Sequence, residues 1–182
     1  SAGISACEKG GRWEWALMLH TETPEATVIG YSATISACAR GERWELAVQL
    51  FEEMRQRAVE ANVVSYNALI SACKRPGLWA LALHLLREML GSRLQADAIS
   101  CCSAISACER GARWELALGF LRQSQRTRVR VDAATCNSAV NVCEKGGRWE
   151  WALALLSWMP CLRLSPDVIG HCSAISACEK AG

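Results

Sequence analysis

The stretch "ISACERGARWELAL", residues 105–118, decides the fold because the chain repeats it. Versions of it begin at Ile4, Ile35, Ile70 and Val140, and an incomplete copy begins at Ile175. From the second copy onward one cysteine recurs every 35 residues, at Cys38, Cys73, Cys108, Cys143 and Cys178. The tryptophans Trp44, Trp79, Trp114 and Trp149 keep the same step. A fixed period of this size indicates an array in which each unit buries its apolar face against its neighbours.

The period divides the chain into units. Four full units span 28–62, 63–97, 98–132 and 133–167, between truncated copies at 1–27 and 168–182. Within a unit, "VVSYNALISACKR" (63–75) predicts a first helix, "PGLW" a turn, and the next apolar stripe a second helix. The stripe is clearest at Trp44, Ala47, Phe51 and Met54. We therefore predict an all-α fold, a right-handed α-solenoid of helix-turn-helix repeats.

Composition and cysteine spacing argue against a membrane-spanning segment and against a zinc site. The 182 residues are 51% hydrophobic with a net charge of +2, and no run of about 18 apolar residues predicts a membrane span. The eleven cysteines include no C-x-x-C pair and no zinc-ligand spacing. We expect the repeated cysteines, and the repeated tryptophans, to be interlayer packing residues, with no metal and no cofactor. Because the chain begins without Met and stops inside a copy, we expect a segment of a longer protein.

Nothing in the sequence predicts an enzyme. The three histidines, His20, His84 and His171, occupy non-equivalent positions of the repeat. There is no nucleophile motif, no phosphate-binding loop and no H-x-E with C-x-x-C signature of a deaminase. Any catalytic or editing domain is expected elsewhere in the parent protein.

One basic residue stands two positions after each repeated cysteine. These residues are Lys9, Arg40, Arg75, Arg110, Lys145 and Lys180. One cation per unit along a solenoid suits a backbone with one phosphate per nucleotide, although a solvated surface position tolerant of Lys or Arg is the alternative. A second basic run, Arg122, Arg126, Arg128 and Arg130, is interpreted as solvated.

The unit "VVSYNALISAC…W.LALHLLREM…AD" resembles the pentatricopeptide repeat, in its 35-residue length, its "YNALI" opening and its "LFEEM"-type second helix. The resemblance covers essentially the whole chain. It implies sequence-specific binding of single-stranded RNA in mitochondria or chloroplasts, in RNA editing, splicing, stabilisation or translation, with no membrane partner.

The resemblance also implies which residues read the bases, at the fifth and last positions of each unit. The pairs are Ser32 with Asn62, Asn67 with Asp97, Cys102 with Asp132, and Asn137 with Asp167. Ser/Asn resembles an adenine reader, Asn/Asp a uracil reader, and Cys/Asp no standard pair, so the implied core is A-U-N-U. A role for the terminal residues as helix caps alone is the alternative. Second-position residues are implied to sandwich the bases: Ile29, Val64, Ile99, Ala134 and Ile169.

A peptide-binding scaffold of the tetratricopeptide type is the competing hypothesis. Those repeats have a period of about 34 residues. The step of 35 and the polar fifth and last positions favour RNA.

Overall fold

The computed structural model describes residues 12–22, 27–92, 94–126, 129 and 131–180. In these residues the chain is helical, and no strand occurs among them. The helices are α2 (Trp13–Glu22), α3 (Val28–Arg40), α4 (Trp44–Gln56), α5 (Val63–Ala72), α6 (Trp79–Gly91), α7 (Ala98–Glu109), α8 (Trp114–Arg126), α9 (Ala133–Lys145), α10 (Trp149–Trp158), the 3-10 helix η1 (Met159–Leu162) and α11 (Val168–Glu179).

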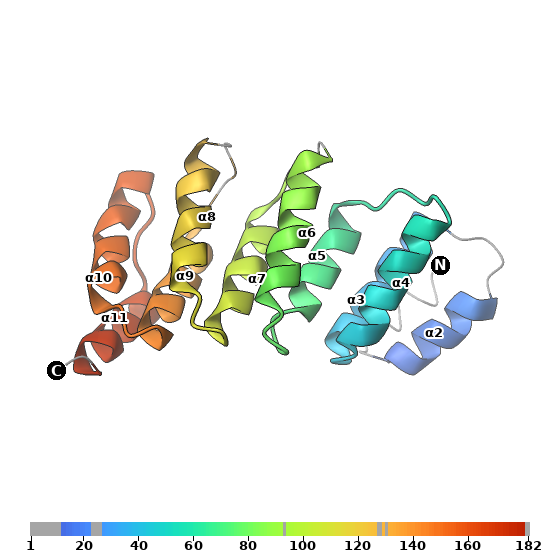
Figure 1. Ribbon diagram of the computed structural model, residues 1–182, viewed down its shortest axis with the longest axis horizontal. Coiled ribbons are helices and arrows are strands. Elements are labelled where there is room, and N and C mark those ends of the chain that lie inside the picture. Colours follow the sequence, from blue (N-terminus) through green and yellow to red (C-terminus); the bar gives the residue numbers. More distant parts are fainter. Residues whose placement is uncertain (1–11, 23–26, 93, 127–128, 130, 181–182) are drawn as a thin grey trace.

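The helices form a solenoid of antiparallel pairs. The first helices α3, α5, α7, α9 and α11 pack one against the next, and each second helix packs on the first helix of its own pair. In Figure 1 the pairs follow one another along the long axis, from α2 (blue) to α11 (red). The predicted all-α solenoid is confirmed. Across the described part of the chain, no helix has both the length and the apolarity needed to cross a membrane.

The last residue of each full unit starts the next first helix. Asn62, Asp97, Asp132 and Asp167 have extended backbone and accept a hydrogen bond from the amide three residues on. A side-chain oxygen at this position satisfies one of the amides that a helix start leaves unpaired. The capping role is therefore real at all four positions. Capping leaves these side chains able to accept a further hydrogen bond, because a carboxylate or an amide oxygen accepts more than one.

Four of the five cysteines that recur every 35 residues lie in the core, and the fifth, Cys178, is half-buried. Cys38, Cys73, Cys108 and Cys143 are at most 1% exposed, and all ten described cysteines are free thiols. Burial raises the pKa of Cys38 and Cys108 to about 11 and that of Cys73 and Cys143 to about 12. Neutral, buried thiols behave as small apolar residues, as the spacing predicted. Among the described residues no group of His, Cys, Asp or Glu is arranged to hold a metal ion.

The tight turn between the two helices of a pair explains the glycines of the repeated stretch. Gly77 and Gly147 have φ of +73° and +64°, a left-handed conformation that glycine adopts without strain. Glu42 and Ala112 occupy the equivalent positions with φ of 61° and 47°, so the turn keeps its shape where glycine is missing. The turn geometry is thus set by the packing of the pair rather than by glycine alone.

Candidate nucleic-acid interface

Asn67 and Asp97 form the best-defined polar pair on the first-helix surface. The Asn67 Nδ2 donates to the two carboxylate oxygens of Asp97, at 3.2 and 3.0 Å. Burial raises the pKa of Asp97, but hydrogen bonds from Ser100 and Asn67 outweigh burial and leave that pKa below its ordinary value. The carboxylate is therefore ionised at neutral pH. A fixed carboxylate beside a fixed amide is suited to recognise the hydrogen-bonding edge of a nucleic-acid base.

The other predicted pairs differ from this one. The Ser32 hydroxyl lies 3.3 Å from Asn62 Oδ1, yet Ser32 is only 4% exposed and donates to the Val28 carbonyl. For Cys102 with Asp132, and for Asn137 with Asp167, no hydrogen bond joins the partners within the described residues. Cys102 instead lies 3.4 Å from the hydroxyl of Ser138. The structure therefore joins two of the four predicted pairs directly.

The second-position residues form an exposed apolar row. Their exposed fractions are 63% for Ile29, 55% for Val64, 63% for Ile99 and 61% for Ile169. Ala134 is exposed as well. Each residue stands in the first turn of its helix, one position after the first helical residue, where the neighbouring pair leaves it uncovered. These side chains are thus free to contact a ligand, which core packing would have prevented.

Five of the six predicted cations are described, and all five are exposed: Arg40, Arg75, Arg110, Lys145 and Lys180. Lys9 lies outside the described residues. Two of the five form ion pairs with the preceding unit, Arg75 with Glu42 and Lys180 with Glu144. Burial raises the pKa of Glu144, but hydrogen bonds from Lys180 and Ser176 and the charge of Lys180 outweigh burial. The pKa of Glu144 therefore lies below its ordinary value, and the side chain is ionised. The cationic row is therefore partly neutralised.

Base-reading residues, second-position apolar residues and cations meet in one groove over α3, α5 and α7. Its volume is about 1090 Å³. Among its lining residues are Arg40, Val64, Asn67, Arg75, Asp97, Ile99 and Arg110. The polar pair of one unit thus shares the groove with two apolar side chains, with three of the predicted cations, and with Lys74. The ion-pairing Glu42 lines the groove too.

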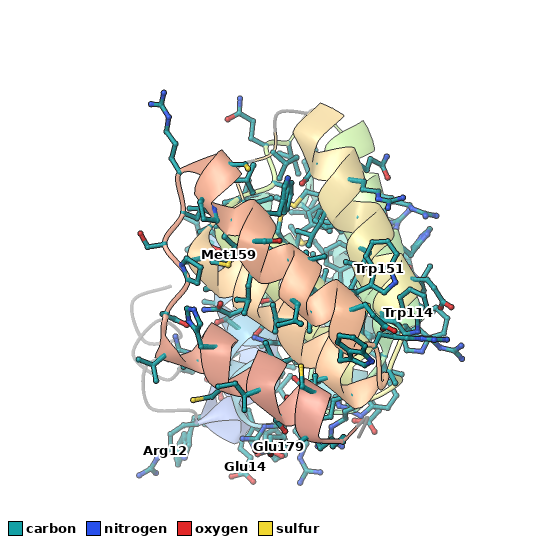
Figure 2. The ribbon with its side chains drawn as sticks, turned by 90° about the vertical axis from the view of Figure 1, so that its left-hand side faces the viewer. Arg12, Glu14, Trp114, Trp151, Met159 and Glu179 are labelled. Atoms are coloured by element: carbon teal, nitrogen blue, oxygen red, sulfur yellow. The ribbon has the colours of Figure 1, made fainter. Side chains whose placement is uncertain are left out.

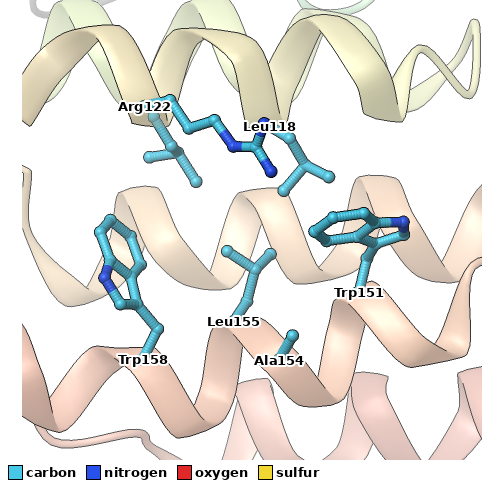
Figure 3. A pocket seen from close by; sticks show the side chains of 7 residues that line it. Leu118, Arg122, Trp151, Ala154, Leu155 and Trp158 are labelled. Carbon is cyan, nitrogen blue, oxygen red and sulfur yellow. The ribbon is translucent and has the colours of Figure 1, made fainter.

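A smaller, apolar hollow of about 340 Å³ lies between α8 and α10, lined by Leu118, Leu121, Arg122, Trp151, Ala154, Leu155 and Trp158 (Figure 3). The Arg122 guanidinium is 5.7 Å from the Trp151 ring centre. Trp151 in turn stacks beside Trp114, at 6.4 Å between centroids, as Figure 2 shows. This hollow holds none of the predicted base-reading residues. Arg128 and Arg130 lie outside the described residues, as does the side chain of Arg126.

Sequence reasoning missed hydroxyl groups next to the predicted readers. Ser100 donates to Asn67 Oδ1, and Ser65 lies 2.7 Å from the Ser32 hydroxyl. Both serines are fully buried. The signal was present, because Ser65, Ser100 and Thr135 keep the 35-residue step at the third position of the unit. Glu42 gave no such signal, because its position in other units holds glycine or alanine.

Comparison with known proteins agrees with the helical-repeat fold. The PPR repeat family model matches residues 26–75, and the PPR repeat model matches residues 64–94. The pentatricopeptide repeat protein PPR10, solved in complex with an 18-nucleotide psaJ RNA element, superposes with a TM-score of 0.83 over 98% of this chain at 26% identity. Residues 26–94 therefore match the pentatricopeptide repeat, and nearly the whole chain has the fold of a pentatricopeptide repeat protein.

Two further pentatricopeptide repeat structures are similar. PPR10 from maize gives a TM-score of 0.77 at 25% identity over 98% of this chain. The PPR domain of Arabidopsis thaliana protein-only RNase P 1, in complex with tRNA, gives 0.69 at 14% identity over 80% of this chain and 77% of that one, a likeness of fold. This chain spans 27% and 31% of the two PPR10 chains. A comparison with curated proteins found no match.

Proposed function

We propose that this chain binds single-stranded RNA and reads one base per unit along its first-helix surface. The observation that carries the proposal is the groove that Asn67 and Asp97 share with the exposed side chains of Val64 and Ile99. Similarity to PPR10, whose structure contains a bound RNA element, supports the same ligand class. The reading units are 28–62, 63–97, 98–132 and 133–167, with A-U-N-U as the preferred core.

The chemistry of unit 63–97 suits a pyrimidine with carbonyl edges. Asn67 Nδ2 carries two hydrogens, and a single N–H shared between the two oxygens of Asp97 can account for both of its contacts with that carboxylate. The second hydrogen is available to a carbonyl oxygen such as those of uracil. Val64 and Ile99 supply apolar surface on the two faces of the base, and covering a base face favours binding in a sequence-tolerant way. Asn67 thus recognises which base is bound, whereas Val64 and Ile99 fix how the base is oriented.

The cationic row supplies the sequence-independent part of binding. Arg40, Arg75 and Arg110 line the same groove and repeat once per unit. Each phosphate neutralised releases condensed counterions, so affinity falls with salt at a slope of about 0.7 per contact for single strands. A net charge of only +2 does not oppose this, because Arg40, Arg75 and Arg110 are gathered in the one groove.

By the same family likeness, we infer a role in organellar RNA processing, editing or stabilisation, in a chloroplast or a mitochondrion. In this role the chain is a non-catalytic RNA-binding array, and processing factors carried elsewhere act on the bound transcript. These inferences rest on the family, whereas the RNA-binding proposal rests also on the groove.

The experiment that tests the proposal is a fluorescence-anisotropy titration of the chain with two labelled single-stranded RNAs at two salt concentrations. One RNA is centred on AUGU, and the other has both uracils changed to guanine. We expect tighter binding of the uracil RNA, and loss of that preference in Asn67→Ser. Ser71→Ala, which changes an exposed residue of the same groove, is the matched control and retains the preference.

Two other outcomes would point elsewhere. Salt-sensitive binding without base preference would retain the cationic row and overturn base reading. Absence of RNA binding at low salt, from a folded monomer, would favour the peptide-binding scaffold of tetratricopeptide type.

A further inference from the structure

The third residue of a first helix lies against the base-reading residue of the preceding unit at three places: Ser65 beside Ser32, Ser100 beside Asn67, and Gly170 beside Asn137. In chain order the third residues of the first helices are Gly30, Ser65, Ser100, Thr135 and Gly170. Their backbone amides are held in the same way, because each donates to the N-cap side chain three residues before it. Only the side chain at this position changes from unit to unit. The side chain at this position is therefore a candidate for the differences between readers.

In unit 63–97 the neighbouring serine holds the reader. The Ser100 hydroxyl lies within hydrogen-bond distance of Asn67 Oδ1 and, at 2.8 Å, of Asp97 Oδ1. When it donates to Asn67 Oδ1, Asn67 Nδ2 donates to Asp97. Both ends of the amide are thereby distinguished, the oxygen facing Ser100 and the nitrogen facing the carboxylate. Asn67 remains half-buried and lines the groove. An amide held this way presents a donor, which suits a base carbonyl.

In unit 133–167 the neighbour is glycine, and the reader behaves differently. Asn137 is only 6% exposed, and its Oδ1 lies 2.5 Å from the place where a Cβ of residue 170 would stand. That oxygen is buried and has no hydrogen-bond partner in the described part of the chain. The amide thus occupies the space that the missing side chain leaves. Asn137 and Asn67, equivalent by position, are presented to solvent unequally.

We propose that the third residue of the following unit is a positioning residue for base reading. Ser100 orients Asn67 and keeps it in the groove, whereas Gly170 lets Asn137 retract between the helices, so that unit 133–167 discriminates its base weakly. The inference rests on the proposed RNA-binding function. It adds a residue from the next unit to the two that the family resemblance implies for each base.

The experiment exchanges the two third residues in the intact chain. Ser100→Gly removes the hydroxyl and opens space, Ser100→Ala removes the hydroxyl alone, and Ser100→Thr keeps a hydroxyl. Gly170→Ser fills the space behind Asn137. Its new Cβ displaces the end of a rotatable side chain, with Leu156 Cδ2 next nearest at 3.3 Å. Cooperative thermal unfolding by circular dichroism confirms that each variant is folded.

The first readout is discrimination between uracil and guanine, at the second and fourth positions of AUGU separately. For the unchanged chain we expect about fivefold at the second position, the worth of one hydrogen bond, and under about twofold at the fourth. Ser100→Gly and Ser100→Ala should reduce the second-position value to under about twofold, and Ser100→Thr should retain it. Gly170→Ser should raise the fourth-position value toward fivefold. Unchanged discrimination in Ser100→Ala and Gly170→Ser would overturn the positioning role.

The second readout needs no RNA. Solvent exchange of the Asn137 side-chain amide, followed by NMR, should quicken in Gly170→Ser because the side chain is pushed outward. Unchanged exchange would overturn the inference whatever the RNA result. If the unchanged chain shows no base preference at either position, the proposed function fails, and the exchange rates still decide whether residue 170 positions Asn137.

Discussion

The guanidinium of Arg148 lies 4.9 Å from the centre of the Trp114 ring, although the two residues belong to successive helix pairs. The same contact joins Arg113 to Trp79 and Arg43 to Trp13. On the same tryptophans a glycine of the next unit approaches closely, so that a Cβ at Gly146 would lie 2.7 Å from Trp114 Cδ1. In units 28–62, 98–132 and 133–167 the repeated "G.RW" therefore forms a clamp, in which a glycine and an arginine pack against the tryptophan of the preceding unit.

Gly146→Ala should destabilise the chain by about 1–3 kcal/mol, because the added methyl group overpacks against the Trp114 ring. The free energy of unfolding from urea titration is the measurement. Gly119→Ala in α8 is the matched control, since a Cβ there meets nothing within 4 Å. The control should be neutral or stabilising by up to about 1 kcal/mol. Equal effects of the two variants would contradict the clamp.

Glu42→Gln should strengthen RNA binding by a few-fold, because it frees Arg75 for phosphate. The slope of log affinity against log salt should steepen by about 0.7, the value for one added contact on a single strand. Glu45→Gln removes the same charge from an exposed position of α4 outside the groove. If both variants strengthen binding equally, the effect is general charge and not release of Arg75.

Val64→Ala should leave stability within about 0.5 kcal/mol of the unchanged chain, because Val64 is 55% exposed. RNA affinity should fall several-fold as contact with the base face is lost. Leu69→Ala, one turn further along α5 and 1% exposed, should instead cost about 2–5 kcal/mol of unfolding free energy. A stability loss in Val64→Ala comparable to that of Leu69→Ala would show that residue 64 serves packing.

Asp97 should make stability depend on acid pH. Its pKa in the folded chain is below the unfolded value of about 4, so its contribution is present above that value and is lost as pH falls through the folded pKa. Asp97→Asn keeps a capping oxygen but does not titrate as a carboxylate. Urea midpoints measured from pH 7 downward should fall less steeply below about pH 4 in this variant than in the unchanged chain. Parallel curves would exclude Asp97 as a contributor.

Much of the fold was predictable because it depends on local pattern. The 35-residue step of Cys38, Cys73 and Cys108 placed these residues in the core, and the turn and capping residues located the helix boundaries. Capping is a contact between residues three apart, and apolar periodicity acts within one helix. Both are therefore readable along the chain. The exposed row of Val64 and Ile99 also follows from position in the first turn.

What only the tertiary structure decided is how equivalent residues differ. Asn67 and Asn137 have the same place in the repeat, yet their surroundings differ. Ser100 contacts Asn67, which lines the groove, whereas Asn137 lies between helices in the space beside Gly170. Likewise Arg75 is bound by Glu42 of the preceding unit, whereas the position of Glu42 holds glycine or alanine in other units. The sequence by itself determined the period, the helices and which residues repeat along the first helices. Contacts between units determined which of those residues are presented, because each depends on a side chain brought near only by stacking.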